Sequence, residues 1–111
     1  MFQRSKQGAV DLIQGADPLN VDHLDQLAGM LAHCSGHGQP RVVLDLEQVP
    51  LIDSAGLELL LDTQEAFQRQ GGALKLAVNN ALCKEILLVT GVGRQFEIHL
   101  DVNSAVGSFV Q

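Results

Sequence analysis

The sequence predicts a single α/β domain, a mixed sheet of about five strands with about four helices packed against it. Its 111 residues suit one compact domain. Apolar residues make up 46% of the chain, enough for one continuous core. Short apolar runs alternate with segments of helical periodicity, the order that gives parallel strand pairs with helical crossovers. We therefore expect one domain over residues 1–111, with its function at a loop or a helix end.

The first part of the chain predicts two strands and a helix. Residues 9–14 form an apolar run, and residues 2–6 suit a short edge strand before it, joined by a turn at residues 7–8. Asn20 is a candidate N-cap of the helix that follows. Apolar residues recur there at helical spacing: Val21, Leu24, Leu27, Ala28, Leu31 and Ala32. The turn-forming tract at residues 35–40 ends this helix.

Residues 41–46 carry the strongest strand signal. Three consecutive aliphatic residues there predict burial on both faces of the sheet. A second helix is predicted from about residue 54 to about residue 70, ended by the glycine pair at residues 71–72. Its inward stripe consists of Leu57, Leu60, Leu61, Gln64 and Phe67.

The remaining chain predicts two further strands, each followed by a helix. The strands are residues 73–78 and 96–99. Asn79 or Asn80 caps the first helix, and Asn103 begins the last one. The apolar residues of the first helix are Leu82, Ile86, Leu87 and Val89.

Charge and composition exclude several classes of function. The net charge of -6 argues against binding to the phosphate backbone of nucleic acids and against a polybasic membrane anchor. No apolar run reaches the about 18 residues that a membrane span needs, and residues 1–6 lack the apolar stretch of a secretory signal. Cys34 and Cys83 match no metal or redox spacing, so we expect reduced structural thiols. These features predict a cytoplasmic domain without a cofactor.

Residues 51–57 carry the candidate site. If Asp53 is the N-cap of the second helix, its carboxylate accepts an amide hydrogen bond from the first turn. Ile52 and Leu57 then occupy the positions of a hydrophobic staple. Ser54 falls at the first helical position, where its side chain points outward and is not needed for the cap. A plain strand-to-helix turn has the same composition, and spacing alone leaves that alternative open.

The beginning of this helix is suited to a switch based on charge. Helix N-termini present free amides and partial positive charge, so a phosphate on Ser54 would be partly accommodated. It would also add a charge of about -1.5 to -2 beside Asp53 on an acidic protein. Such a group would leave the fold intact while repelling a partner. We expect Gly56, which lacks a Cβ, to let another molecule approach the backbone closely.

Residues 42–60, with the sequence VVLDLEQVPLIDSAGLELL, resemble the core signature of STAS domains, in particular the stand-alone anti-sigma-factor antagonists of bacteria. The resemblance covers nearly the whole chain, including the glycine pair before residues 73–78. It implies a non-catalytic switch in which an anti-sigma factor that is a serine kinase phosphorylates Ser54. The unphosphorylated protein binds that kinase and frees the sigma factor, phosphorylation breaks the complex, and a serine phosphatase resets it. Asn20, Asp53, Ala55 and Gly56 would line the same partner-binding surface.

The same motif also resembles a second group within this family. Many phosphorylated members have Ser or Thr where this chain has Ala55. The Asp-Ser-Ala-Gly form is similar to small STAS subunits of phospholipid-transport ABC systems, in which this helix end contacts the ATPase. The resemblance therefore implies two partners, a kinase or a transporter ATPase.

Two chemical alternatives are weaker. A serine hydrolase would need a Gly-x-Ser-x-Gly elbow, but Ile52 stands where its first glycine belongs. Nothing in the spacing directs a histidine base to Ser54; the candidates are His23, His33, His37 and His99. A metal site could use His33, Cys34 and His37, but the glycines at 36 and 38 predict that the helix breaks there and leaves a solvated turn. We expect neither a catalytic residue nor a metal.

Overall fold

A computed structural model describes residues 1–36 and 38–110. Within these residues the chain forms five strands, four α-helices and one short 3-10 helix. The strands are β1 (Phe2–Gln7), β2 (Val10–Gly15), β3 (Arg41–Asp45), β4 (Ala73–Ala77) and β5 (Ile98–His99). The helices are α1 (Leu24–Ser35), α2 (Ser54–Arg69), α3 (Ala81–Val89), η1 (Val92–Gln95) and α4 (Val102–Ser108).

The strands form one mixed sheet in the order β1-β2-β3-β4-β5. β1 and β2 are an antiparallel hairpin, and the other neighbouring strands pair in parallel. Gly8, with a φ of 65°, takes the left-handed conformation at the hairpin turn. The predicted α/β fold with a mixed sheet is confirmed.

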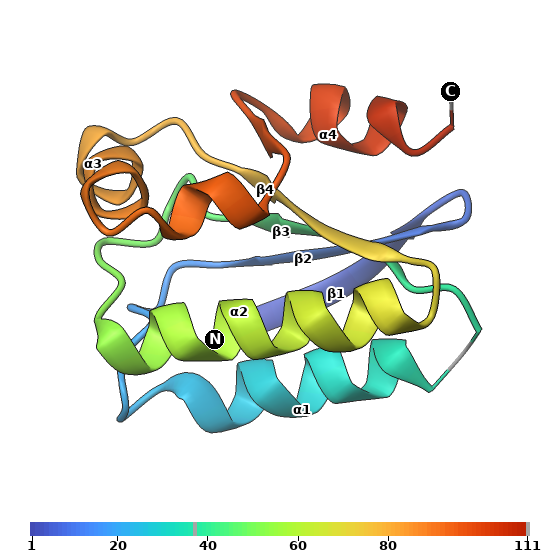
Figure 1. Cartoon of the computed structure of the whole chain (residues 1–111), viewed down its shortest axis with the longest axis horizontal. Coiled ribbons are helices and arrows are strands. Elements are labelled where there is room, and N and C mark those ends of the chain that lie inside the picture. Colours follow the sequence, from blue (N-terminus) through green and yellow to red (C-terminus); the bar gives the residue numbers. More distant parts are fainter. Residues whose placement is uncertain (37, 111) are drawn as a thin grey trace.

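Helices cover both faces of the sheet, as Figure 1 shows. α1 and α2 lie side by side on one face, and α4 lies on the other. β3 supplies both cores because its side chains alternate between the faces. Val42 and Leu44 belong to the core with α1 and α2, and Val43 belongs to the smaller core with Ala105 of α4. The burial of β3 on both faces is thus confirmed.

The first helix begins later than the sequence predicts. Residues 21–23 form a turn in which the His23 amide donates to the Asn20 carbonyl at 2.9 Å. The Asn20 side chain accepts from the Asp22 amide, which makes this turn rather than a helix cap. The prediction that Asn20 caps the helix is therefore wrong: α1 begins at Leu24, and Val21 is 71% exposed.

The last elements also differ at their boundaries. The cap of α3 is Asn80, one of the two residues predicted for it, which accepts from the Cys83 amide at 2.8 Å. β5 spans only residues 98–99, because η1 occupies the residues just before Phe96. α4 begins at Val102 and not at Asn103, since Asp101 takes the capping position and accepts from the Ser104 amide at 2.7 Å.

Candidate functional site

The beginning of α2 is capped as the sequence predicts. Asp53 has extended backbone angles, and its Oδ1 accepts a hydrogen bond from the Gly56 amide at 2.9 Å. Ile52, before the cap, is buried, and Leu57 is half-buried, as a hydrophobic staple requires. The carboxylate of Asp53 therefore fixes the start of the helix without help from the next residue.

Ser54 is exposed at the first position of α2. Within residues 1–36 and 38–110, the Ser54 hydroxyl makes no hydrogen bond. The helix does not need it as a cap, because the Asp53 carboxylate fills that role. Unpaired amides and the positive end of the helix dipole surround this position. Ala55, the next residue, is half-buried. The geometry presents a hydroxyl to solvent beside an anionic cap.

Gly56 has a different role from the expected one. It is buried, and a Cβ built on it would lie 2.4 Å from the carbonyl oxygen of Leu19. The space left by the missing side chain is thus filled by the loop between β2 and α1. The expectation that another molecule approaches the backbone at Gly56 is corrected, because the Leu19 carbonyl of the same chain occupies that space.

Two loops are joined at this end of the sheet. The Leu19 amide donates to the Leu51 carbonyl at 3.0 Å, and the Asp53 amide donates to the Leu19 carbonyl at 3.0 Å. These bonds form a parallel bridge between Leu19 and Ile52. Because Asn20 directly follows Leu19, the bridge brings it to the same end of the sheet as Asp53. Asn20 Oδ1 also accepts from the ring of His23 at 2.8 Å when that ring carries a proton on Nδ1.

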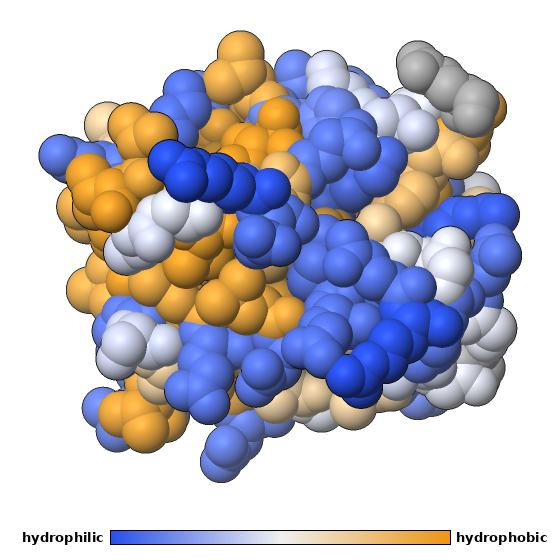
Figure 2. Space-filling model, viewed as in Figure 1, coloured by the Kyte–Doolittle hydropathy of each residue, from blue (hydrophilic) through white to orange (hydrophobic). Residues whose placement is uncertain are grey.

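An apolar surface adjoins the serine. Leu57 and Leu61, one and two turns beyond Ser54 on α2, are half-buried. Further apolar side chains come from α3 and η1, and η1 contacts both α2 and α3. Figure 2 shows apolar atoms gathered where Figure 1 places α3, η1 and the start of α2. We call this the α2–α3 surface; its residues are Leu57, Leu61, Ile86, Val89 and Val92.

Sequence reasoning missed this surface although a signal was present. α3 carries apolar residues all round its axis, with Lys84 and Glu85 as its charged residues. A helix buries only one side against a single core, so the apolar residues on the other sides of α3 must lie at the surface. Cys83 and Leu87 are buried, whereas Val89 is 72% exposed.

The comparison with known proteins decides the family. The model of the family described as "STAS domain" matches residues 11–105. The chain belongs to this family. No curated protein matches the sequence.

Solved structures share the STAS fold with this chain. A putative anti-sigma factor antagonist from Thermotoga maritima is 19% identical, with a TM-score of 0.91, over 99% of this chain and 95% of that one. An anti-sigma factor antagonist from Mycobacterium paratuberculosis is 16% identical, with a TM-score of 0.90, over 100% and 94%. The murine anion transporter Slc26a9 is 15% identical, with a TM-score of 0.71, over 92% of this chain and 18% of the transporter. At these identities the likeness concerns the fold.

The histidines of this STAS domain do not build a hydrolase site in the described residues. His23 hydrogen-bonds Asn20, and His99 hydrogen-bonds Glu97 at 2.9 Å. In residues 1–36 and 38–110 no hydrogen bond joins a histidine to Ser54. His37, another candidate base, lies outside the described residues. The nucleophile–base pair that a serine hydrolase needs is therefore not formed by the described histidines.

The cysteines of the STAS domain are buried thiols. Cys34 and Cys83 are both free, and burial raises the pKa of each thiol. α1 ends at Ser35, and His37, the third residue of the metal site considered from the sequence, lies outside the described residues. The part of the chain that the structure describes holds no group of three or more His, Cys, Asp or Glu residues arranged for a metal. It also contains no helix with the length and apolarity to cross a bilayer.

Proposed function

We propose that this STAS domain is a phosphorylation-gated protein-binding module, an anti-sigma-factor antagonist. In this proposal it binds an anti-sigma serine kinase while Ser54 is unphosphorylated and releases it once Ser54 carries a phosphate. A serine phosphatase restores the binding form. The observation that carries the proposal is the exposed Ser54 hydroxyl, which the Asp53 cap leaves unused at the start of α2.

The α2–α3 surface supplies the binding energy in this proposal. Burial of exposed apolar side chains contributes about 25 cal/mol per Å² of apolar area removed from water. Leu57 and Leu61 place part of this area on the side of α2 that carries Ser54. A partner that covers these residues therefore also covers the serine, so binding and the state of Ser54 are coupled.

The charge of a phosphate explains release. Phosphorylation adds a charge of about -1.5 to -2 at the edge of an apolar interface. The partner would have to remove water from that charge, which is costly when no cation pairs with it. Asp53 precedes the phosphate, and Glu58 lies one helical turn away on the same side. The helix dipole offsets only part of this repulsion.

A second candidate partner is the ATPase of a phospholipid-transport ABC system. Ala55 favours it, because the Asp-Ser-Ala-Gly form of the motif is similar to that of such transporter subunits. Under this proposal the same surface contacts the ATPase, and the domain regulates transport in the cytoplasm. Neither proposal assigns catalysis or a cofactor to this chain.

Phosphorylation of the intact protein separates the two proposals. We expect incubation with ATP and a candidate anti-sigma serine kinase to add one phosphate at Ser54, detected by mass spectrometry and lost in Ser54→Ala. Ser104→Ala is the matched control, because Ser104 is also exposed in the first turn of a helix. If Ser54 remains unmodified and the protein copurifies with an ABC ATPase, the transporter proposal replaces the first.

A charge variant tests the mechanism of release. Ser54→Asp should keep the fold and weaken binding to the kinase, because it adds charge at the interface without breaking a core contact. Ser54→Asn is the control for Ser54→Asp, because asparagine has nearly the same shape as aspartate and carries no charge. Equal affinity of the two variants, measured by calorimetry, would remove the electrostatic part of the proposal.

A further inference from the structure

A small apolar pocket lies on the other flank of α3 from the α2–α3 surface. Leu88 faces this pocket, whereas Ile86 lies on the opposite side of the buried Leu87, because successive helical residues are about 100° apart. The pocket has a volume of about 260 Å³ and is bounded by α3, η1 and β5. Its lining residues are Lys84, Leu87, Leu88, Gly93, Arg94 and Ile98.

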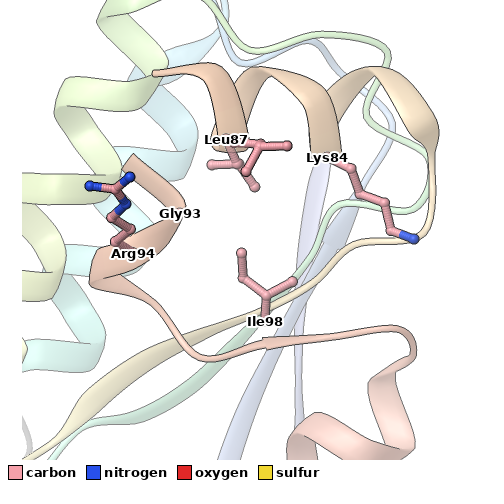
Figure 3. A pocket seen from close by; sticks show the side chains of 6 residues that line it. Lys84, Leu87, Gly93, Arg94 and Ile98 are labelled. Atoms are coloured by element: carbon pink, nitrogen blue, oxygen red, sulfur yellow. The ribbon is translucent and has the colours of Figure 1, made fainter. Parts of the chain in front are cut away.

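The walls of the pocket are aliphatic. Figure 3 shows the side chains of Leu87 and Ile98 extending toward each other from α3 and β5. Gly93 packs closely against both walls: a Cβ on it would lie 3.3 Å from Leu87 Cβ and 3.3 Å from Ile98 Cδ1, closer than ordinary van der Waals contact. A side chain at residue 93 would crowd both walls, so glycine is what lets η1 form this side of the pocket.

Two cations stand at the ends of this apolar space. Arg94 and Lys84 lie on opposite sides of the pocket in Figure 3, and both are exposed. Within residues 1–36 and 38–110 neither makes an ion pair. Unpaired positive charge beside an apolar pocket is notable in a chain of net charge -6. It complements a ligand that joins an apolar body to a negative group.

We propose that this pocket binds a small anionic amphiphile, an unbranched alkyl chain that ends in a carboxylate. The alkyl chain packs against the lining residues Leu87, Leu88 and Ile98, and the carboxylate pairs with Arg94 or Lys84. The pocket is at the small end for ligand sites, which suits one short chain better than a drug-sized molecule. None of its lining residues belongs to the Ser54 site, so the two sites operate through different surfaces.

Decanoate, used below its critical micelle concentration, tests the proposal on the intact protein. In a titration followed by amide NMR, we expect the shifts to concentrate in α3, η1 and β5. Decyltrimethylammonium has the same chain with a cationic head, and we expect it to bind at least about ten-fold more weakly. Ser54→Asp should bind decanoate like the unmodified protein, which makes failure of this proposal distinguishable from failure of the proposed function.

Charge reversal at the pocket provides the second test. The double variant Lys84→Glu/Arg94→Glu should lose decanoate affinity by at least about ten-fold, while its dispersed amide spectrum shows that it remains folded. Arg41→Glu is the control, because Arg41 is exposed at the start of β3 and does not line the pocket. Equal binding of the two amphiphiles, or shifts spread over the whole chain, would overturn the proposal. Concentration-dependent shifts of the same amides without decanoate would replace it with contact between two copies of the chain.

Discussion

The carbonyl oxygen of Leu19 packs against the Cα of Gly56, so closely that a Cβ on Gly56 would lie 2.4 Å from it. The same carbonyl accepts the amide of Asp53 at 3.0 Å. One backbone group thus joins the loop after β2 to the cap of α2. The position of Ser54 depends on this contact, because the cap that precedes it is held from both sides.

Gly56→Ala should destabilise the protein and disturb the start of α2. The atom that the new methyl group meets belongs to the backbone, which has little freedom to move, and overpacking of this kind typically costs about 1–3 kcal/mol. Urea unfolding measures the loss. Gly29→Ala is the matched control, since Gly29 is exposed in α1 and a Cβ there meets nothing within 4 Å. It should stabilise the protein by up to about 1 kcal/mol. Equal effects of the two variants would contradict the close contact.

Local patterns predicted most of the fold, because hydrophobic period and cap chemistry act over a few residues. The aliphatic run of β3 indicated burial on both faces, and Asp53 indicated its own cap, as observed. Asn20 was predicted wrongly because a side chain that caps a helix can equally close a turn on its own backbone. The neighbour of Gly56 could not be predicted, since Leu19 meets it only through tertiary packing.

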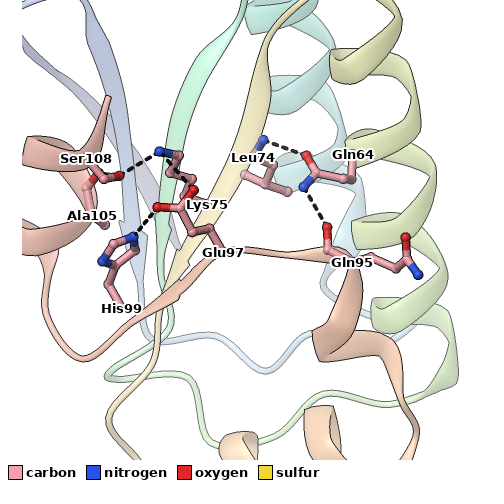
Figure 4. A network of polar contacts seen from close by, with 8 residues as sticks. All are labelled: Gln64, Leu74, Lys75, Gln95, Glu97, His99, Ala105 and Ser108. Carbon is pink, nitrogen blue, oxygen red and sulfur yellow. Dashed lines mark hydrogen bonds and ion pairs between the residues drawn. The ribbon is translucent and has the colours of Figure 1, made fainter. Parts of the chain in front are cut away.

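For Gln64, helical periodicity predicts that the side chain is buried but does not predict its hydrogen-bonding role. The sequence places it in the inward stripe of α2, and it is buried. Its amide accepts from the Leu74 amide at 2.7 Å and donates to the Gln95 carbonyl at 2.9 Å (Figure 4). Because β5 is too short to pair with this part of β4, the side chain takes the place of a neighbouring strand.

Gln64→Leu should therefore destabilise the protein even though leucine suits a core. The substitution leaves the buried Leu74 amide without its partner, and an unsatisfied buried group costs about 1–3 kcal/mol. The exchange of the Leu74 amide hydrogen should also become faster. Gln68→Leu provides the comparison, because Gln68 is exposed on the same helix. If both variants unfold at the same urea concentration, Gln64 contributes no more than packing.

Cys34 and Cys83 should react slowly with thiol reagents in the native state. Both are buried, and burial raises both pKa values, so the reactive thiolate is scarce and shielded. With a disulfide reagent at about pH 8, we expect slow modification of the folded protein and rapid modification of both thiols in denaturant. Single Cys34→Ser and Cys83→Ser variants assign the two rates. Fast reaction of either thiol in the folded protein would show that its helix opens readily.

A charged cluster attaches α4 to the sheet. The Lys75 ammonium donates to Ser108 Oγ at 2.7 Å, pairs with Glu97 at 3.2 Å and lies 4.1 Å from the centre of the Phe109 ring. Glu97 also accepts from His99 when that ring is protonated or carries its proton on Nε2 (Figure 4). The pKa of Glu97 lies below its usual 4.5, chiefly because of the hydrogen bond with His99. The hydrogen bond with Lys75 lowers this pKa further.

The lowered pKa of Glu97 predicts how stability depends on pH. Because the folded state favours ionised Glu97, this contribution is fully present above the unfolded pKa, near 4.5. It is lost as the pH falls through the lower folded pKa. We therefore compare the free energy of unfolding of Glu97→Gln with that of the unmodified protein. The difference between the two should become smaller as urea unfolding is repeated from about pH 6 to about pH 3.

The size of this effect should be small, because the Glu97 side chain is 54% exposed and water screens its charge. Glu58→Gln is the control: Glu58 is exposed on α2 and, within residues 1–36 and 38–110, has no ion-pair partner. Its pH profile should run closer to that of the unmodified protein. A Glu97→Gln profile parallel to that of the unmodified protein would show that the cluster holds α4 through Ser108 and Phe109, with no contribution from the carboxylate.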